Sequence, residues 1–218
     1  MKILIKLIIA VLLAGATTGG TGYFFWYRPK SSLKPRGVAF GLHKSYDKGH
    51  INLRLRQKAV EARDFTRLNH YNKVHCFFID MKISSGGKRF FVYNLSKDSV
   101  EGAGLVAHGS GSDKGGGGLV FSNRPNSNCS SLGRYRIGKP YYGRFGLAYK
   151  LYGLEESNDK AFERFVVLHA HACVPSEEVL PVSICESWGC PTVAPAFLGV
   201  VKDYINSSAE PVLLWIYY

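Results

Sequence analysis

VHCFFIDMKISSGGKRFFVYN, residues 74–94, carries the clearest secondary-structure signal in the chain. Two apolar runs, residues 74–80 and 88–94, flank the turn residues SSGG at 84–87. Short runs rich in Phe, Val and Tyr on either side of a Ser/Gly turn are typical of a β-hairpin. We therefore expect a domain built mainly from β-strands.

Similar short runs follow the hairpin and extend this prediction to the rest of the chain. We predict strands at residues 100–106, 119–121, 133–138, 146–152, 165–170 and 212–218, and helical turns at 161–164 and within 192–206. The Gly/Ser-rich loop 109–118 is predicted to be too flexible to form part of a core. Many short strands with few helices favour a β-rich α+β fold, either a sandwich or an open barrel.

A helix is predicted before the hairpin, over residues 51–70. From Leu55 onwards its apolar residues mostly recur at the 3.6-residue period of a helix, and Arg and Lys occupy the other positions. This pattern indicates a helix that packs against the domain and exposes a basic face to solvent. We place the packing helix within residues 45–72 and the folded domain within residues 73–218.

The N-terminal end has the composition of a membrane or export segment. Residues 3–27 contain one charged residue, Lys6, and a bilayer span needs about 20 residues. The apolar part, residues 7–16, also has the length of a signal-peptide core, whereas the aromatic residues 23–27 are typical of a membrane interface. We expect residues 1–27 to be a signal anchor or signal peptide that leads to the membrane, followed by a linker at 28–44.

The net charge of +12 over 218 residues is concentrated near the N-terminus. Residues 1–36 hold six basic residues and no acidic ones, whereas residues 76–218 are nearly balanced. A nucleic-acid-binding protein more often spreads its basic residues over a folded recognition face. We therefore expect no nucleic-acid partner. The apolar fraction of 46% is sufficient for a core and excludes wholesale disorder.

Cys190, in the sequence SWGCP at residues 187–191, is the first candidate for chemistry. Gly189 permits a tight turn and Pro191 restrains the chain, so that a thiol here can be exposed on a stiff loop, as a nucleophile must be. The alternative is a buried cysteine that packs as a small apolar residue.

His169 ends the apolar run at residues 165–168 and can face a cysteine on a nearby loop. A neighbouring imidazole raises the thiolate fraction and carries the proton. His169 and His171 are two residues apart on a predicted strand and share a face, so they are alternatively two metal ligands, although no further ligands follow at a suitable spacing. His108 is a second candidate for the site.

Several motifs, taken in order, resemble the murein L,D-transpeptidase catalytic domain family. They are AHGSGS (107–112), FSN (121–123), CSSLGRY (129–135), GLEESND (153–159), RFVVLHAHACV (164–174) and SWGCP (187–191). The resemblance covers residues 75–218, and the combination is specific although each motif alone is not. Members of this family are cysteine enzymes of the cell envelope, which agrees with the separate export signal at the N-terminus.

The resemblance implies a role for each residue around the predicted site. Cys190 is the nucleophile, His169 is the base, and the carbonyl of Ala170 orients the imidazole. Ser187 and Gly189 shape the loop, and the backbone N–H groups near Cys190 and Gly189 form an oxyanion hole. No cofactor and no metal are expected.

Substrate contacts are implied for residues around this site, namely Trp188, His108, Ser122, Asn123 and His171. For Ser122 and Asn123 the alternative is a structural one, a turn cap or a hydrogen bond at a strand end. The chain also departs from the broader family. Trp188 stands where His is common, and Pro191 and Thr192 follow the cysteine where a basic or polar residue is often found.

The resemblance implies that the substrate is a peptidoglycan stem tetrapeptide. Cys190 forms a thioester with its third residue, D-Ala leaves, and an amine from another stem takes the acyl group in a 3→3 cross-link. With water as the acceptor the enzyme is an L,D-carboxypeptidase. The alternatives are a non-enzymatic wall-binding module, a cysteine hydrolase and a metal-dependent peptidase. The expected location is the bacterial cell envelope, in the periplasm or at the outer face of the inner membrane.

The four remaining cysteines allow three pairings once Cys190 is set aside as the nucleophile. A bond between Cys173 and Cys185 closes the active-site stretch, and a bond between Cys76 and Cys129 joins strands. Export permits disulfides without requiring them, so the sequence leaves the pairing open.

Overall fold

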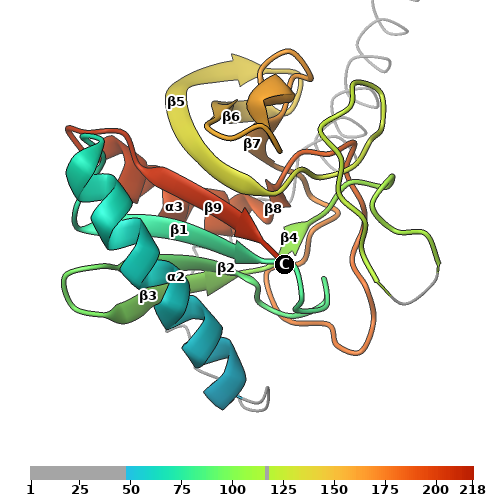
Figure 1. Ribbon diagram of the computed structural model, residues 1–218. Coiled ribbons are helices and arrows are strands. Elements are labelled where there is room, and N and C mark those ends of the chain that lie inside the picture. The colour runs from blue at the N-terminus through green and yellow to red at the C-terminus, as the bar shows by residue number, and fades with distance from the viewer. Residues whose placement is uncertain (1–47, 116–117) are drawn as a thin grey trace, which may run out of the picture. The chain divides into compact units, whose positions relative to one another are not determined.

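The computed structural model describes residues 48–115 and 118–218 (Figure 1). The predicted signal or anchor segment and the linker, residues 1–44, lie outside these residues. Within the described part, no helix combines the length and the apolar character that crossing a bilayer requires.

The described chain forms one nine-stranded sheet with few helices, which confirms the β-rich prediction. The strands are β1 (His75–Asp80), β2 (Phe90–Asn94), β3 (Ser99–Gly104), β4 (Val106–Ala107), β5 (Gly133–Gly143), β6 (Gly146–Gly153), β7 (Val167–Ala170), β8 (Thr192–Val193) and β9 (Leu213–Tyr217). The helices are α2 (Lys48–Leu68), the single 3-10 turn η2 (Asp159–Ala161) and α3 (Pro195–Asn206).

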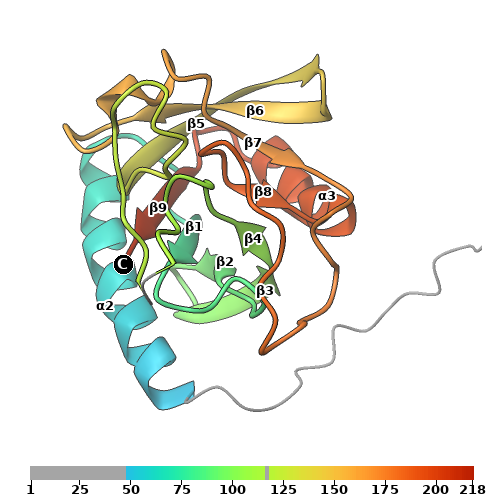
Figure 2. The same ribbon diagram turned by 90° about the vertical axis from the view of Figure 1, so that its right-hand side faces the viewer.

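The sheet curls almost into a barrel. Its strand order is β3-β2-β1-β9-β5-β6-β7-β8-β4. Only Leu105 separates β3 from β4 in the sequence, yet these two strands are the opposite ends of the order. The sheet must therefore curl until its ends approach each other, as Figure 2 shows. Of the two predicted forms, the structure adopts the open barrel.

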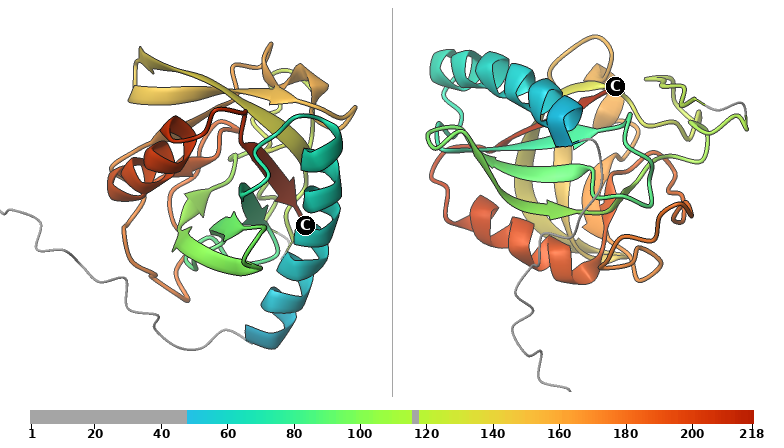
Figure 3. Two further views of the ribbon diagram at one scale, coloured as in Figure 1. Left: turned by 90° about the vertical axis from the view of Figure 1, so that its left-hand side faces the viewer. Right: turned by 90° about the horizontal axis from the view of Figure 1, so that it is seen from below.

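The hairpin at residues 74–94 forms as predicted, with β1 and β2 antiparallel. On its other side β1 pairs in parallel with β9. Successive residues of β1 enter different cores: Phe77 and Ile79 pack in the cluster that contains α3, whereas Cys76 and Phe78 pack in the cluster that contains α2. The two helices thus cover opposite faces of this part of the sheet (Figure 3). Burial on both faces explains the unbroken apolar run.

Three of the predicted elements differ from the structure. The predicted strand 100–106 divides at Leu105 into β3 and β4. Residues 119–121 form no strand, and only an isolated bridge joins Leu119 to Asp113. The predicted helical segment 192–206 divides into β8 and α3. Pro195 is the first residue of α3, and Ala194 before it is extended with ψ 145°. A residue that precedes proline is disfavoured in the helical conformation, so the helix begins at Pro195 and the two residues of β8 stay extended.

The packing of α2 leads to a stability prediction. Leu55 is buried in the cluster between α2 and the sheet, whereas Leu53 on the same helix is 56% exposed. We expect Leu55→Ala to lower the free energy of unfolding by about 2–5 kcal/mol, because the substitution leaves a cavity in this cluster. Urea unfolding of the full chain measures the change. Leu53→Ala is the matched control, and an equal loss in both variants would contradict the packing described here.

Candidate active site

The pairing of β7 with β8 brings the two predicted catalytic residues together. His169 on β7 is in register with Thr192 on β8, and Cys190 precedes Thr192 by two residues. The Cys190 Sγ accepts the backbone N–H of Val167, which precedes His169 by two residues on β7, at 3.4 Å. The same strand therefore carries the imidazole and contacts the thiol.

Three contacts fix the His169 ring. Its Nδ1 lies 3.1 Å from the carbonyl oxygen of Ala170, the contact that the family resemblance implied. Because a carbonyl oxygen only accepts, Nδ1 carries the proton and Nε2 is the acceptor. The Thr192 hydroxyl donates to Nε2 at 2.9 Å. Phe145, in the turn between β5 and β6, stacks on the imidazole with 4.7 Å between the ring centroids.

The environment keeps His169 neutral. Burial is the main cause that lowers the pKa of His169, and the nearby His171 acts in the same direction. The Ala170 carbonyl opposes these effects by accepting the Nδ1 proton. The ring is therefore a neutral base whose acceptor nitrogen is Nε2, the atom that the Thr192 hydroxyl contacts.

The Cys190 side chain is a protonated thiol in this arrangement. Its S–H donates to the carbonyl oxygen of Phe165 at 3.7 Å. Burial raises the pKa of Cys190, while the Val167 N–H and the Arg164 guanidinium oppose that effect. In the described part of the chain, no hydrogen bond joins the Cys190 Sγ to His169. The predicted nucleophile and base are thus neighbours with separate partners.

The turn at residues 187–190 shows why the motif contains Ser and Gly. The Ser187 hydroxyl donates to the Cys190 carbonyl at 2.6 Å and accepts the Gly189 N–H at 3.2 Å. Gly189 has φ +109°, and a Cβ there would lie 2.8 Å from the Cys129 carbonyl oxygen, so no other residue fits. Of the two N–H groups expected in the oxyanion hole, that of Gly189 is used by Ser187, whereas no hydrogen bond among the described residues uses that of Cys190.

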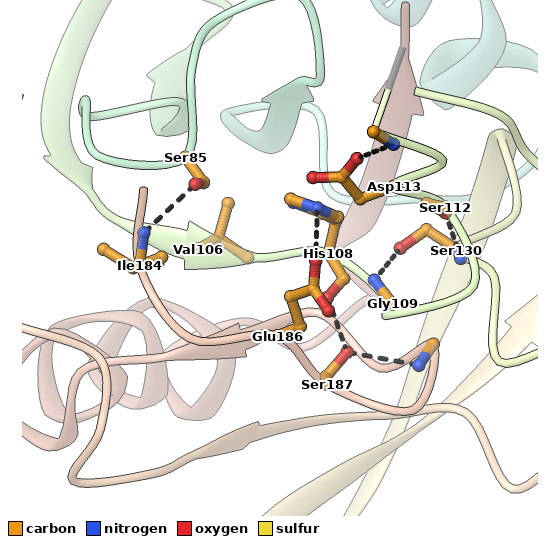
Figure 4. Close-up of polar contacts among 12 residues, drawn as sticks. Ser85, Val106, His108, Gly109, Ser112, Asp113, Ser130, Ile184, Glu186 and Ser187 are labelled. Carbon is orange, nitrogen blue, oxygen red and sulfur yellow. Dashed lines mark hydrogen bonds and ion pairs between the residues drawn. The ribbon is translucent and has the colours of Figure 1, made fainter. Parts of the chain in front are cut away.

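Backbone hydrogen bonds join this turn to the segment after β4, and Figure 4 shows Ser187 beside His108 and Gly109 of that segment. The Ser187 N–H donates to the His108 carbonyl at 2.8 Å, and the Ser110 N–H donates to the Ser187 carbonyl at 2.8 Å. Gly109 and Ser187 also form an isolated parallel bridge. The position of the Cys190 loop is therefore set from two sides, by β7 and by residues 108–110.

The prediction that the loop 109–118 is too flexible for a core is wrong at its start. Ser112 is fully buried, and its hydroxyl accepts the Ser130 N–H at 3.0 Å. A Cβ at Gly109 would lie 2.1 Å from the Asn128 carbonyl oxygen. The small residues of this stretch allow two backbones to pack closely, which is a structural use of Gly and Ser that also occurs in flexible loops.

His108 lies in the interior, at 5% exposure, rather than on a surface open to substrate. Its Nδ1 lies 2.9 Å from Nη2 of Arg89. The same Nη2 donates to the Val106 carbonyl, and Nη1 donates to the Ile83 carbonyl. Burial and the Arg89 charge lower the pKa of His108 to about 4, against the opposing effect of Asp113. His108 is thus a neutral, buried side chain that supports the site, and its expected contact with substrate stays a prediction.

His108 also belongs to a group with the composition of a metal site. Among the described residues, His108, Asp113 and Glu186 bring their ligand atoms within 4.8 Å of one another (Figure 4). The Nε2 of His108 is buried without a hydrogen-bond partner, 3.7 Å from Oε1 of Glu186. A guanidinium only donates, so Arg89 requires the imidazole lone pair on Nδ1 and leaves the proton on Nε2. Nε2 is then a donor towards Glu186, and the group does not fit a metal ion.

Two of the residues predicted to contact substrate, Trp188 and His171, are exposed to solvent. Trp188 is 75% exposed in the turn before Cys190. His171 is also exposed, and its Nδ1 accepts the Cys173 N–H at 3.1 Å. The alternative metal site at His169 and His171 has no third ligand among residues 48–115 and 118–218.

Ser122 and Asn123 make structural contacts. The Ser122 hydroxyl accepts the Arg124 N–H at 3.1 Å. The Asn123 amide donates to the Asp159 carboxylate at 2.6 Å and to the Glu156 carbonyl at 2.8 Å. These contacts fit the structural alternative to substrate binding: Ser122 caps a turn, and Asn123 joins its loop to residues 156–159 by hydrogen bonds.

Arg164 is a site residue that the sequence analysis missed. Its guanidinium donates to the carbonyls of Ser122 at 3.0 Å and Cys129 at 2.6 Å, and to the Ser131 hydroxyl at 3.2 Å. It thereby holds the loop against which the Cys190 turn packs. A single arginine before an apolar run has no sequence signal that separates it from a solvent-exposed charge.

The cysteines divide into one disulfide and three thiols within the described chain. Cys173 and Cys185 are bonded, as one of the open pairings had it. The pairing of Cys76 with Cys129 is wrong, because both are reduced and buried. Cys76 faces the α2 side of β1, where its thiol donates to the Leu213 carbonyl at 3.4 Å.

Comparison with known proteins identifies a family. The sequence pattern of the L,D-transpeptidase catalytic domain matches residues 47–217. Among curated proteins, none matches this chain in sequence.

Solved structures resemble the chain more distantly. One is a variant of the helical cell shape determining protein Pgp2 from Campylobacter jejuni, with a TM-score of 0.43, 11% identity, and coverage of 66% of this chain and 46% of the other. The Ldtfm–avibactam carbamoyl enzyme gives a TM-score of 0.42 and 9% identity, over 67% of this chain and 50% of the other. A second structure of Pgp2 from Campylobacter jejuni gives a TM-score of 0.41 and 11% identity, over 66% of this chain and 47% of the other. The chain thus spans about half the length of these proteins.

The buried His108 predicts a pH dependence of stability. Its folded-state pKa of about 4 lies below the ordinary value of 6.5, so between these values the unfolded chain binds a proton that the folded chain does not. The free energy of unfolding should therefore decrease as the pH falls through this range, by up to roughly 3 kcal/mol. Urea unfolding of the full chain at about pH 7 and about pH 4.5 measures the slope.

Two variants separate this effect from other titrating groups. His108→Asn should reduce the slope, whatever it does to stability at neutral pH. His70→Asn is the matched control, because His70 is exposed and its φ of 58° suits Asn, and it should retain the wild-type slope. An unchanged slope in His108→Asn would refute the assignment.

Proposed function

We propose that this chain, which belongs to the L,D-transpeptidase catalytic domain family, is a peptidoglycan-modifying cysteine transpeptidase. The observation that carries the proposal is the pairing of β7 with β8, which places the Cys190 thiol against the strand of His169. A thiol and a neutral imidazole in one neighbourhood are the groups that acyl transfer through a cysteine needs.

Each step of the reaction uses a group described above. The His169 Nε2 takes the Cys190 proton, and the thiolate attacks the carbonyl of the third residue of a stem tetrapeptide. The Cys190 N–H is the donor available to the developing oxyanion. The tetrahedral intermediate collapses as His169 returns the proton to the leaving D-Ala nitrogen. The thioester on Cys190 then passes to an amine of a second stem, which gives a 3→3 cross-link.

Several contacts support these roles. The Ala170 carbonyl holds the proton of His169 on Nδ1, so Nε2 faces β8 as a base. Phe145 covers one face of the imidazole, and the exposed Trp188 stands directly before Gly189 and Cys190. These two aromatic side chains supply apolar surface beside the reacting groups, where a stem peptide can pack.

The Cys173–Cys185 disulfide supports an extracytoplasmic location. Disulfides persist mainly in oxidising compartments such as the bacterial periplasm. We place the domain in the cell envelope on this ground and on the family's substrate. The signal or anchor role of residues 1–27 remains part of the proposal and agrees with it.

Intact-mass spectrometry of the full chain with a disaccharide tetrapeptide tests the chemistry. Wild type should form a covalent acyl adduct, and Cys190→Ala should form none. His169→Ala should form the adduct at least about 100-fold more slowly, because general acid–base catalysis typically contributes that much. Cys129→Ala and Cys76→Ala are matched controls that remove the two buried thiols and should leave the adduct in place.

The released products distinguish the acceptor. Addition of a second stem peptide should give a cross-linked dimer, whereas formation of the tripeptide alone would show hydrolysis. An adduct in Cys190→Ala would exclude the assigned nucleophile. No adduct in wild type, together with a Cys190 that does not react with a small alkylating agent, would favour the wall-binding module.

A further inference from the structure

The Thr192 hydroxyl occupies the atom of His169 that must receive the Cys190 proton. A neutral imidazole has one acceptor nitrogen. In His169 this nitrogen is Nε2, because Nδ1 donates to the Ala170 carbonyl. Thr192 donates to Nε2 at 2.9 Å. One lone pair does not serve two full hydrogen bonds, so the thiol and the hydroxyl compete for it.

The contact between Thr192 and His169 is protected from water and held by the backbone. Thr192 is 3% exposed and His169 is 5% exposed. Their backbones are partners in the parallel pair of β7 and β8, which sets the distance between the two side chains. A hydrogen bond away from solvent is stronger than the same bond in water, because no water molecule replaces either partner.

The thiol has partners of its own. Cys190 donates to the Phe165 carbonyl at 3.7 Å, and its Sγ accepts the Val167 N–H at 3.4 Å. A thiol that donates to a carbonyl is protonated. The nucleophile and the base are therefore uncoupled in this arrangement, each by a named contact.

We propose that Thr192 is a positioning residue of the catalytic pair, and that its hydroxyl caps the Nε2 lone pair of His169 and keeps Cys190 a thiol in the resting enzyme. The inference rests on the proposed function, in which Cys190 is the nucleophile and His169 the base. It adds that the Thr192 hydroxyl controls when the Cys190 thiolate and the His169 imidazolium form.

The structure also shows how the cap is released. The Thr192 Oγ1 lies 3.4 Å from the Cys190 carbonyl oxygen, which is a second acceptor for the same hydroxyl proton. Rotation of the hydroxyl towards that carbonyl frees Nε2. The S–H bond of Cys190 then breaks and an N–H bond forms on His169, which gives a thiolate and an imidazolium without any other reactant.

Alkylation of Cys190 by iodoacetamide, followed by mass spectrometry on the full chain without substrate, tests the cap. Thr192→Val keeps the shape of the side chain and removes the donor. It should increase the alkylation rate at about pH 6 roughly three- to tenfold, the factor that corresponds to one hydrogen bond of ordinary strength. Thr192→Ser keeps the hydroxyl and should react as wild type does.

The increase must depend on the base. His169→Ala combined with Thr192→Val should lose it, because the thiol then has no imidazole to pair with. NMR titration of the His169 ring gives a second readout: its pKa should be higher in Thr192→Val than in wild type and unchanged in Thr192→Ser, because a donor to Nε2 favours the neutral ring. A purely structural role of Thr192 would not produce this pattern.

An unchanged or slower alkylation in a folded Thr192→Val overturns the cap, and a slower one would indicate that Thr192 passes the proton instead. The acyl-adduct experiment separates this failure from failure of the function. If wild type forms the adduct while Thr192→Val alkylates like wild type, the function stands and the cap is wrong. If wild type forms no adduct, the proposed function fails whatever Thr192 does.

Discussion

The candidate site depends on β8, a strand of two residues between β7 and β4. Its parallel pairing with β7 sets Thr192 beside His169, and its antiparallel pairing with β4 sets the same segment beside the chain that leads to His108. Only Pro191 separates Cys190 from β8, so the backbone pairing that positions the base also positions the nucleophile. Because backbone pairing leaves little freedom in register, the two residues of β8 are enough to align the side chains of His169, Cys190 and Thr192.

Two arginines, the buried Arg89 and the partly buried Arg164, support this arrangement. Arg89 fixes the tautomer of His108, whose carbonyl holds the Ser187 turn, and Arg164 ties the Cys129 segment to the start of the β7 stretch. A guanidinium satisfies several carbonyls at fixed angles, and leaving those carbonyls unpaired in the interior would be costly. A guanidinium also only donates, so the Arg89 contact leaves the His108 proton on Nε2. A protonated Nε2 does not bind a metal ion, and the cluster around His108 is therefore a hydrogen-bonded support.

The resting geometry and the reaction make different demands on the same atoms. Burial favours a protonated thiol and a neutral imidazole, and both groups find hydrogen-bond partners in those states. The proposed reaction requires the thiolate and the imidazolium instead. The energy needed to pass from one state to the other is small if each lost partner is replaced, and the Cys190 carbonyl is placed to accept the Thr192 proton at that moment. The family resemblance led to the proposed pair of Cys190 and His169, whereas these contacts describe the resting state of the two groups.

The sequence by itself determined the β-rich class, the hairpin at residues 74–94, and Cys190 and His169 as the candidate pair. Apolar runs and Ser/Gly turns are properties of neighbouring residues, and the motifs are read in order along the chain. Only the tertiary structure decided the partners of these groups. The helical pattern at 192–206 concealed β8, a lone Arg164 carried no signal, and three cysteine pairings were equally possible. Each was settled by segments distant in the chain, whose close packing selects one set of contacts that no local pattern specifies.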